Sequence, residues 1–210
     1  MLWFIAVCGV ATLLSIPPSL LAQHPPPPPP PGPAGPPLPN ARDVGERIER
    51  VRNQLESSKG TDSDQDQLLT AARVAVRTAA EALRENALRR AARLVDGADA
   101  FRRAAEHPGH IKEPPKGPRP QPQQREIADH LQRVYFRLQQ ADFFATTSQV
   151  REMDELPAVA RNFYEKARQS YDRGVWLAAD EYVKSADDTM HGLENLAQAA
   201  QENEPPPSPK

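Results

Sequence analysis

Residues 156–200 read LPAVARNFYEKARQSYDRGVWLAADEYVKSADDTMHGLENLAQAA. Apolar and small side chains recur there every three or four positions, as on the buried face of an amphipathic helix. Gly174 interrupts the pattern, and a left-handed glycine is a common end for a helix. The spacing therefore predicts two helices joined by a short turn. The positions on the buried faces are Leu156, Ala160, Phe163, Ala167 and Ser170, followed by Trp176, Ala179, Val183, Ala186, Met190, Leu193, Ala197 and Ala200.

The same three-helix pattern occurs twice in the chain. A predicted helix over about 123–145 precedes the hairpin, and its apolar positions are spaced 4-3-4. The same spacing lies 83 residues earlier, and further along a shift of 88 residues aligns Asn86 with Gly174. We therefore expect an internal repeat, with a five-residue insertion in the loop 146–155 of the second copy. The matching positions are Val44, Ile48, Val51 and Leu55, and Ile127, Leu131, Val134 and Leu138.

The first copy has its own start and stop signals. Its first helix covers about 41–58 and stops at Gly60, which suits a left-handed terminator. Residues 61–64 offer N-caps for the next helix. The apolar pattern from there to His107 fits one helix of about 40 residues or two helices. The alignment of Asn86 with Gly174 favours two, because Asn tolerates left-handed backbone.

Proline clusters divide the chain, which has 210 residues and 24 prolines. Prolines in such clusters cannot continue a helix. The predicted fold class is therefore all-α: two related three-helix units, or one continuous bundle, joined by a proline-rich hinge. The predicted segments are a signal peptide at 1–22, a disordered proline-rich spacer at 23–39, helical units at 40–107 and 123–204, a linker at 108–122 and a disordered tail at 205–210.

The N-terminal run predicts export. Residues 2–16 are almost entirely apolar, but fifteen residues are short for a membrane span. Ala22 offers a cleavage point before Gln23, as in a secretory signal peptide. The run lacks a preceding Lys or Arg, so an uncleaved membrane anchor stays the alternative. We expect a periplasmic or extracellular protein that touches a membrane only through an uncleaved leader, with an extended polyproline spacer after it.

Composition excludes several functional classes. The single cysteine, Cys8, lies in the leader, which excludes a disulfide framework, a Cys-ligated zinc and a catalytic thiol in the mature chain. The net charge of −2 argues against nucleic-acid binding. Residues 41–111 carry a charge of +1 and residues 121–204 a charge of −6. No phosphate-binding loop, HExxH motif or Ser/His/Asp pattern occurs, so we predict no enzyme and no cofactor.

Two histidine-containing stretches are candidate metal sites. Asp187, His191 and Glu194 are spaced i, i+4, i+7, which places their side chains on one face of a helix, where they could ligate a divalent ion. A solvated acidic face explains the same spacing, and we prefer it because Lys184 interrupts the stripe. His107 and His110 flank Pro-Gly at a predicted helix stop and form a second, weaker candidate.

Charged and aromatic faces give two further candidates. Arg73, Arg77 and Arg84 form a stripe that suits a phosphate or an anionic lipid, or pairs with neighbouring acids on a solvated face. Phe136 and Phe143 lie seven residues apart, opposite the apolar seam of their helix. A helix that is apolar on two sides is either central in a bundle or half exposed for a partner. Phe136 and Phe143 are thus the predicted partner surface, with internal packing as the alternative.

Residues 160–190 resemble the second half of a tetratricopeptide-type helical hairpin. The resemblance rests on Tyr171-x-x-Gly174 with Ala179, Val183 and Ala186, and it implies helical hairpins used for protein binding. We therefore predict an exported, non-enzymatic interaction or scaffold protein of the cell envelope, whose partner is another protein. The alternative is a periplasmic helical bundle that binds a small molecule or a divalent metal.

Overall fold

The predicted hairpins are both present. The computed structural model describes residues 39–112 and 123–202, which belong to one compact unit and are all-helical, without strands. In the second copy, Pro157 starts the hairpin in the first turn of α7, where its missing N–H costs nothing. In the first copy, the Asp62 side chain accepts a hydrogen bond from the Gln65 N–H and caps α2. The hairpins consist of α2 (Ser63–Arg84) with α3 (Leu88–Glu106), and α7 (Leu156–Asp172) with α8 (Trp176–Gln201).

Both hairpins turn in the same way. Asn86 and Gly174 are left-handed, with φ of 60° and 72°. In the first turn, Ala87 N–H donates to Ala82 C=O and Asn86 N–H to Leu83 C=O, the two bonds of a Schellman motif. The same two bonds recur 88 residues later, at the end of α7: Val175 to Ser170 and Gly174 to Tyr171. The break predicted at Asn86 is thus confirmed, and the stretch up to His107 is two helices.

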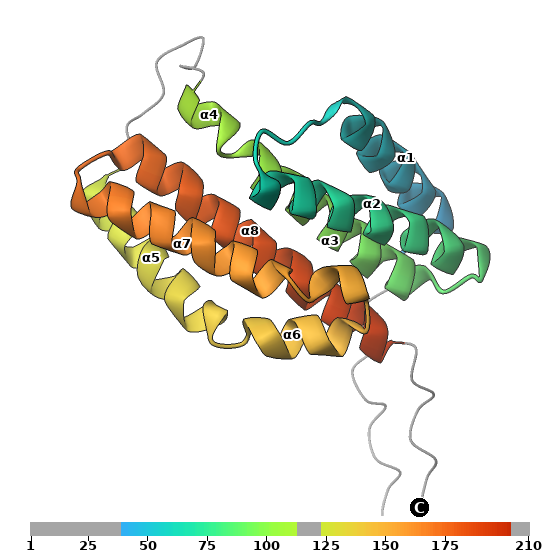
Figure 1. Cartoon of the computed structure of the whole chain (residues 1–210). Helices are drawn as coiled ribbons and strands as arrows, with labels where there is room; N and C mark the ends of the chain where they lie inside the picture. Colours follow the sequence, from blue (N-terminus) through green and yellow to red (C-terminus); the bar gives the residue numbers. More distant parts are fainter. Residues whose placement is uncertain (1–38, 113–122, 203–210) are drawn as a thin grey trace, which may run out of the picture. The chain divides into compact units, whose positions relative to one another are not determined.

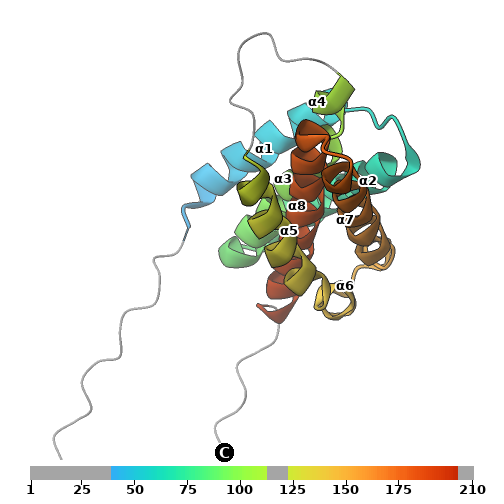
Figure 2. The same ribbon diagram turned by 90° about the vertical axis from the view of Figure 1, so that its left-hand side faces the viewer.

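The hairpins pack on each other through α3 and α8. These helices run antiparallel, because Gly97 lies against Leu196 whereas Arg103 pairs with Asp188. Glycines allow a close approach on both helices: a Cβ at Gly97 would lie 2.2 Å from Cδ1 of Leu196, and one at Gly192 would lie 2.2 Å from Cε1 of Phe101, which is fully buried. The core is therefore continuous between the copies. Figures 1 and 2 show α3 and α8 side by side, with α8 central and in contact with α3, α4, α5, α6 and α7.

The remaining helices cover this four-helix centre. α1 (Ala41–Ser57) lies on α2 and α3, and α5 (Gln124–Leu138) lies on α7 and α8, so the first helix of each copy covers its own hairpin. The apolar seams predicted for these two helices are their buried faces. Three short elements complete the fold: α4 (Gly109–Lys112), α6 (Ala141–Ser148) and the 3₁₀ turn η1 (Arg151–Met153).

Two helix ends differ from the prediction. Gly60 is not left-handed, because α1 already ends at Ser57, where the Ser57 and Ser58 hydroxyls donate to Gln54 C=O. The predicted helix 123–145 is interrupted at Gln139–Gln140, and the chain bends into α6. The bend buries Ala141 and Ala145 of α6, which packs on α8, a gain that a straight continuation would forgo.

Several predicted segments lie outside the described residues. These are the signal peptide, nearly all of the spacer, the linker from residue 113 onward and the tail. Among the described helices, none combines the length and the apolar character that crossing a membrane requires.

Candidate functional site

The predicted partner residues are among the most exposed large apolar side chains that the structure describes. Phe136 is 61% exposed and Phe143 62%, although the bend after α5 places them on different helices. Neither phenylalanine is packed inside the bundle. Tyr135, which is 48% exposed, contacts the Phe136 ring edge-on at 5.7 Å between centroids. Exposed aromatic side chains grouped in this way are typical of surfaces that contact other molecules.

Tyr135 also forms one wall of a groove between α5 and α7. Its ring lies 6.2 Å from that of Tyr164 across the two helices. Burial is the main cause that raises the pKa of Tyr164, so its phenol stays neutral. The hollow, which we call the α5–α7 groove, has a volume of about 340 Å³. It is lined by Tyr135, Leu138, Gln139, Asp142, Arg161, Tyr164, Glu165 and Arg168.

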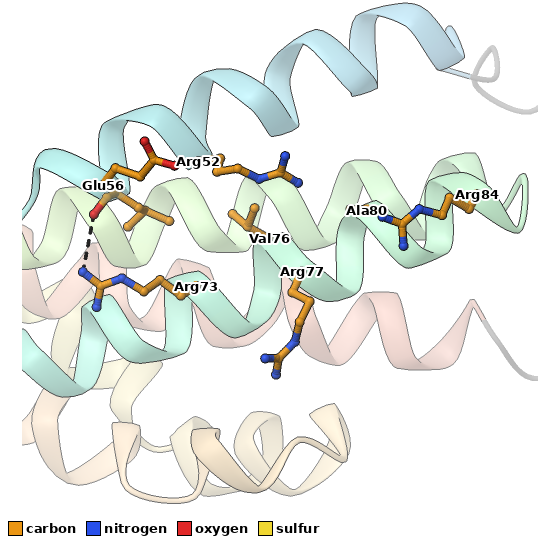
Figure 3. Close-up of a pocket in the computed structure, with 8 residues that line it drawn as sticks. Arg52, Glu56, Arg73, Val76, Arg77, Ala80 and Arg84 are labelled. Carbon is orange, nitrogen blue, oxygen red and sulfur yellow. Dashed lines mark hydrogen bonds between the residues drawn. The ribbon is translucent and has the colours of Figure 1, made fainter.

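A matching groove lies between α1 and α2 of the first copy. Figure 3 shows the side chains that surround it. The groove has a volume of about 350 Å³ and is lined by Arg52, Leu55, Glu56, Arg73, Val76, Arg77, Ala80 and Arg84. Seven of these eight positions coincide with the lining of the α5–α7 groove when shifted by 83 residues in α1 or 88 in α2. Arg52 thus takes the place of Tyr135, and Val76 the place of Tyr164. The repeat extends to a surface feature, but the chemistry of the lining has changed.

The arginines of this α1–α2 groove do not converge on one point. Arg73 donates to the backbone carbonyls of Leu55 and Ser58, each at 3.4 Å, and so caps the end of α1. In Figure 3 the Arg77 side chain points away from α1. None of the three arginines of the stripe pairs with an acid in the described part of the chain, whereas Arg90, on the same basic surface, lies 3.8 Å from Glu85.

The predicted ligands Asp187, His191 and Glu194 do not come together. Asp187 accepts from His130 Nε2 at 3.2 Å and also pairs with Arg137. Burial opposes ionisation of Asp187, but His130 and Arg137 outweigh it and lower the pKa of its carboxyl. Glu194 pairs with Arg137 as well, at 3.0 Å, whereas the His191 side chain is exposed. The two carboxylates therefore fasten α5 to α8, and His191 is not part of that network.

The weaker candidate, His107 and His110, joins a carboxylate that sequence spacing did not indicate. Both Nδ1 atoms face Oε2 of Glu181, at 3.1 Å from His107 and 3.0 Å from His110. Glu181 is buried, which opposes its ionisation, yet the two imidazoles and Lys184 lower its pKa to about 2. Burial also opposes a charge on His107, but Asp188 and Glu181 outweigh it and raise the His107 pKa. Only the antiparallel packing of α3 on α8 brings these groups together.

Comparison with known proteins adds no relative. No family model matches the sequence, and no curated protein or solved structure matches the chain.

Proposed function

We propose that this protein is an exported, non-enzymatic helical scaffold of the cell envelope that binds a second protein in the α5–α7 groove. The partner segment is uncharged and proline-rich. The observation that carries the proposal is the cluster of the exposed Tyr135 and Phe136 with the half-buried Tyr164 at a groove of about 340 Å³.

The shape and side chains of the groove favour an extended proline-rich ligand. Polyproline II segments dock in grooves lined by aromatic rings, because proline rings pack flat on them. Such segments are extended before they bind and lose little conformational entropy. Tyr135 and Tyr164 provide two neighbouring rings, and their hydroxyls are suited to donate to the free carbonyls of the ligand backbone.

The charges around the groove favour an uncharged ligand. Two acids and two arginines line it, and Asp142 already pairs with Arg161 at 2.6 Å. The lining is neutral overall, so it attracts neither a basic nor an acidic peptide. The matching α1–α2 groove has four arginines and one glutamate, which makes it unsuitable for the same ligand. The proposal of export rests on the apolar run at residues 2–16 and the cleavage point before Gln23.

A peptide of residues 24–39, HPPPPPPPGPAGPPLP, is a direct probe of the groove, because it is proline-rich and has no acidic or basic residue apart from His24. Isothermal titration with residues 38–210, which form a compact unit, should show binding with one site. Tyr135→Ala should weaken it at least tenfold, and the Phe136→Asp/Phe143→Asp double variant should weaken it too.

Two controls make the titration decisive. Val175→Asp replaces a side chain that is 50% exposed but belongs neither to the groove lining nor to the exposed aromatic residues next to lining positions, so it should leave the affinity unchanged. The same peptide with every proline replaced by alanine should not bind. Absence of heat with the proline-rich peptide, or equal affinity in the Tyr135→Ala variant, would contradict the proposal.

A further inference from the structure

We propose that His107, His110 and Glu181 form a binding site for a divalent cation, with Zn²⁺ as the best fit, where the end of α3 and the start of α4 meet α8. In the described part of the chain they are the one group of three His, Cys or carboxylate residues whose ligand atoms all lie within 4.8 Å of one another. This site is independent of the α5–α7 groove and of the partner proposed for it.

The ligand atoms are spaced almost as zinc requires. Zinc binds imidazole nitrogen and carboxylate oxygen at about 2.0–2.1 Å, so neighbouring ligand atoms of a tetrahedral site are about 3.4 Å apart. The Nδ1 atoms of His107 and His110 lie 3.1 and 3.0 Å from Glu181 Oε2. A separation larger by a few tenths of an ångström admits the ion. Each imidazole then releases its Nδ1 proton to solvent, and the metal takes the place of both protons.

A carboxylate behind the first ligand orients it. Asp188 Oδ2 lies 3.1 Å from Nε2 of His107, so this nitrogen keeps its proton and leaves Nδ1 for the metal. Arg103 holds Asp188 in turn, at 3.0 Å. An imidazole bound to a metal on one side and to a carboxylate on the other is the usual arrangement in zinc proteins.

The described ion pairs around the site contain more carboxylates than Lys and Arg side chains. Lys184 lies 3.5 Å from the other oxygen of Glu181, Oε1, and pairs at 2.5 Å with Asp180. Two groups of ion pairs, which His107 joins, contain five carboxylates and three Lys or Arg side chains among the described residues. These residues are Asp99, Glu106, Asp180, Glu181 and Asp188 with Arg102, Arg103 and Lys184.

The site is accessible from one side. The side chain of His110 is 45% exposed, whereas those of His107 and Glu181 are 17% and 5% exposed. Three protein ligands leave the fourth tetrahedral position for water or for a group from outside. The bound ion would also connect α4, at the start of the predicted linker, to α8. Metal occupancy would therefore decide how firmly the end of the first copy is held on the second.

Titration of the untagged chain from Gln23 with Zn²⁺ tests the proposal. Calorimetry should give one ion per chain, and Co²⁺ in place of Zn²⁺ should show the intense visible absorption of a tetrahedral ion. His110→Ala should weaken Zn²⁺ binding at least 100-fold, and because His110 is half exposed the chain should still fold. Asp188→Asn should weaken it about tenfold, since it removes the carboxylate behind a ligand.

His191→Ala is the matched control. His191 is exposed, lies on α8 like the ligand Glu181, and is not a member of the proposed site. This variant should bind Zn²⁺ like the unaltered chain, and circular dichroism should confirm that all variants are helical. Absence of binding, equal affinity in His110→Ala, or loss of binding in His191→Ala would each overturn the proposal.

Discussion

The two copies share a framework and differ in what covers it. Both consist of a covering helix and a hairpin with the same left-handed turn, and both have a groove at matching positions. The first copy has alanines at five buried positions of α2 and one aromatic residue, Phe101. The second copy has nine aromatic residues, the added helix α6 and the carboxylates Glu181 and Asp188.

We interpret the framework that both copies share as the scaffold, and the residues found in one copy as the carriers of the proposed functions. The shared residues include the small and apolar ones that determine helix packing, whereas Tyr135, Glu181 and Asp188 have no identical residue 83 or 88 positions earlier. Arg52 matches Tyr135, Arg93 matches Glu181 and Ala100 matches Asp188. The first copy thus completes the core of the second and contributes His107 to the proposed metal site.

The largest expected effect tests whether the copies share one core. Phe101→Ala removes a fully buried ring between α3 and α8 and should cost about 3–5 kcal/mol of unfolding free energy. Trp176, at the start of α8, is the one tryptophan after residue 22 and reports on the second copy. The midpoint of urea unfolding, measured by the fluorescence of Trp176, should therefore shift to a lower urea concentration. An unchanged midpoint would mean that the copies unfold separately.

The contact between α3 and α8 is tested by adding a methyl group. Gly192→Ala would place a Cβ 2.2 Å from the Phe101 ring and should destabilise the fold by about 1–3 kcal/mol. Gly109 has no atom within 4 Å of such a Cβ, so Gly109→Ala is the control and should have little effect. Equal melting temperatures of the two variants would contradict the close approach of the helices.

The matching turns should respond differently to substitution. Gly174→Ala forces a Cβ into left-handed backbone and should cost about 1–2 kcal/mol. At Asn86, which has the same backbone conformation, replacement by Gly should be nearly neutral because Asn already tolerates it. Thermal unfolding of both variants measures the difference, and an equally large loss at Asn86 would show that its side chain has a further role.

The smallest effect is the pH dependence of the contact between α5 and α8. The pKa of Asp187 is lowered in the folded chain, so its carboxylate stabilises the fold above the unfolded pKa of 3.8. That stabilisation is lost as the pH falls through the lower folded pKa. Asp187→Asn should cost under about 1 kcal/mol at pH 7, because the pair is partly exposed. The difference in unfolding free energy between the unaltered chain and the Asp187→Asn variant should be smaller at pH 3 than at pH 7. An equal difference at both pH values would exclude an ionic contribution.

Local patterns in the sequence were sufficient for most helices and turns. Periodicity identified the buried faces, and the alignment of Asn86 with Gly174 identified the break between α2 and α3. The bend at Gln139–Gln140 was missed because neither residue breaks a helix by itself. Glu181 was missed as a partner of His110 because it lies 71 residues away, and only the packing of α8 beside α3 brings it near. Contacts of that kind depend on tertiary geometry, which spacing along one helix does not contain.

The most direct test of the separation between scaffold and function is an NMR titration of residues 38–210, labelled with ¹⁵N, with the peptide 24–39. Our interpretation predicts amide shifts around Tyr135 and Tyr164 and none around the matching Arg52 and Val76. Tyr135→Arg, which introduces the residue of the first copy, should abolish the shifts. Shifts confined to the α1–α2 groove, or no shifts at all, would contradict it.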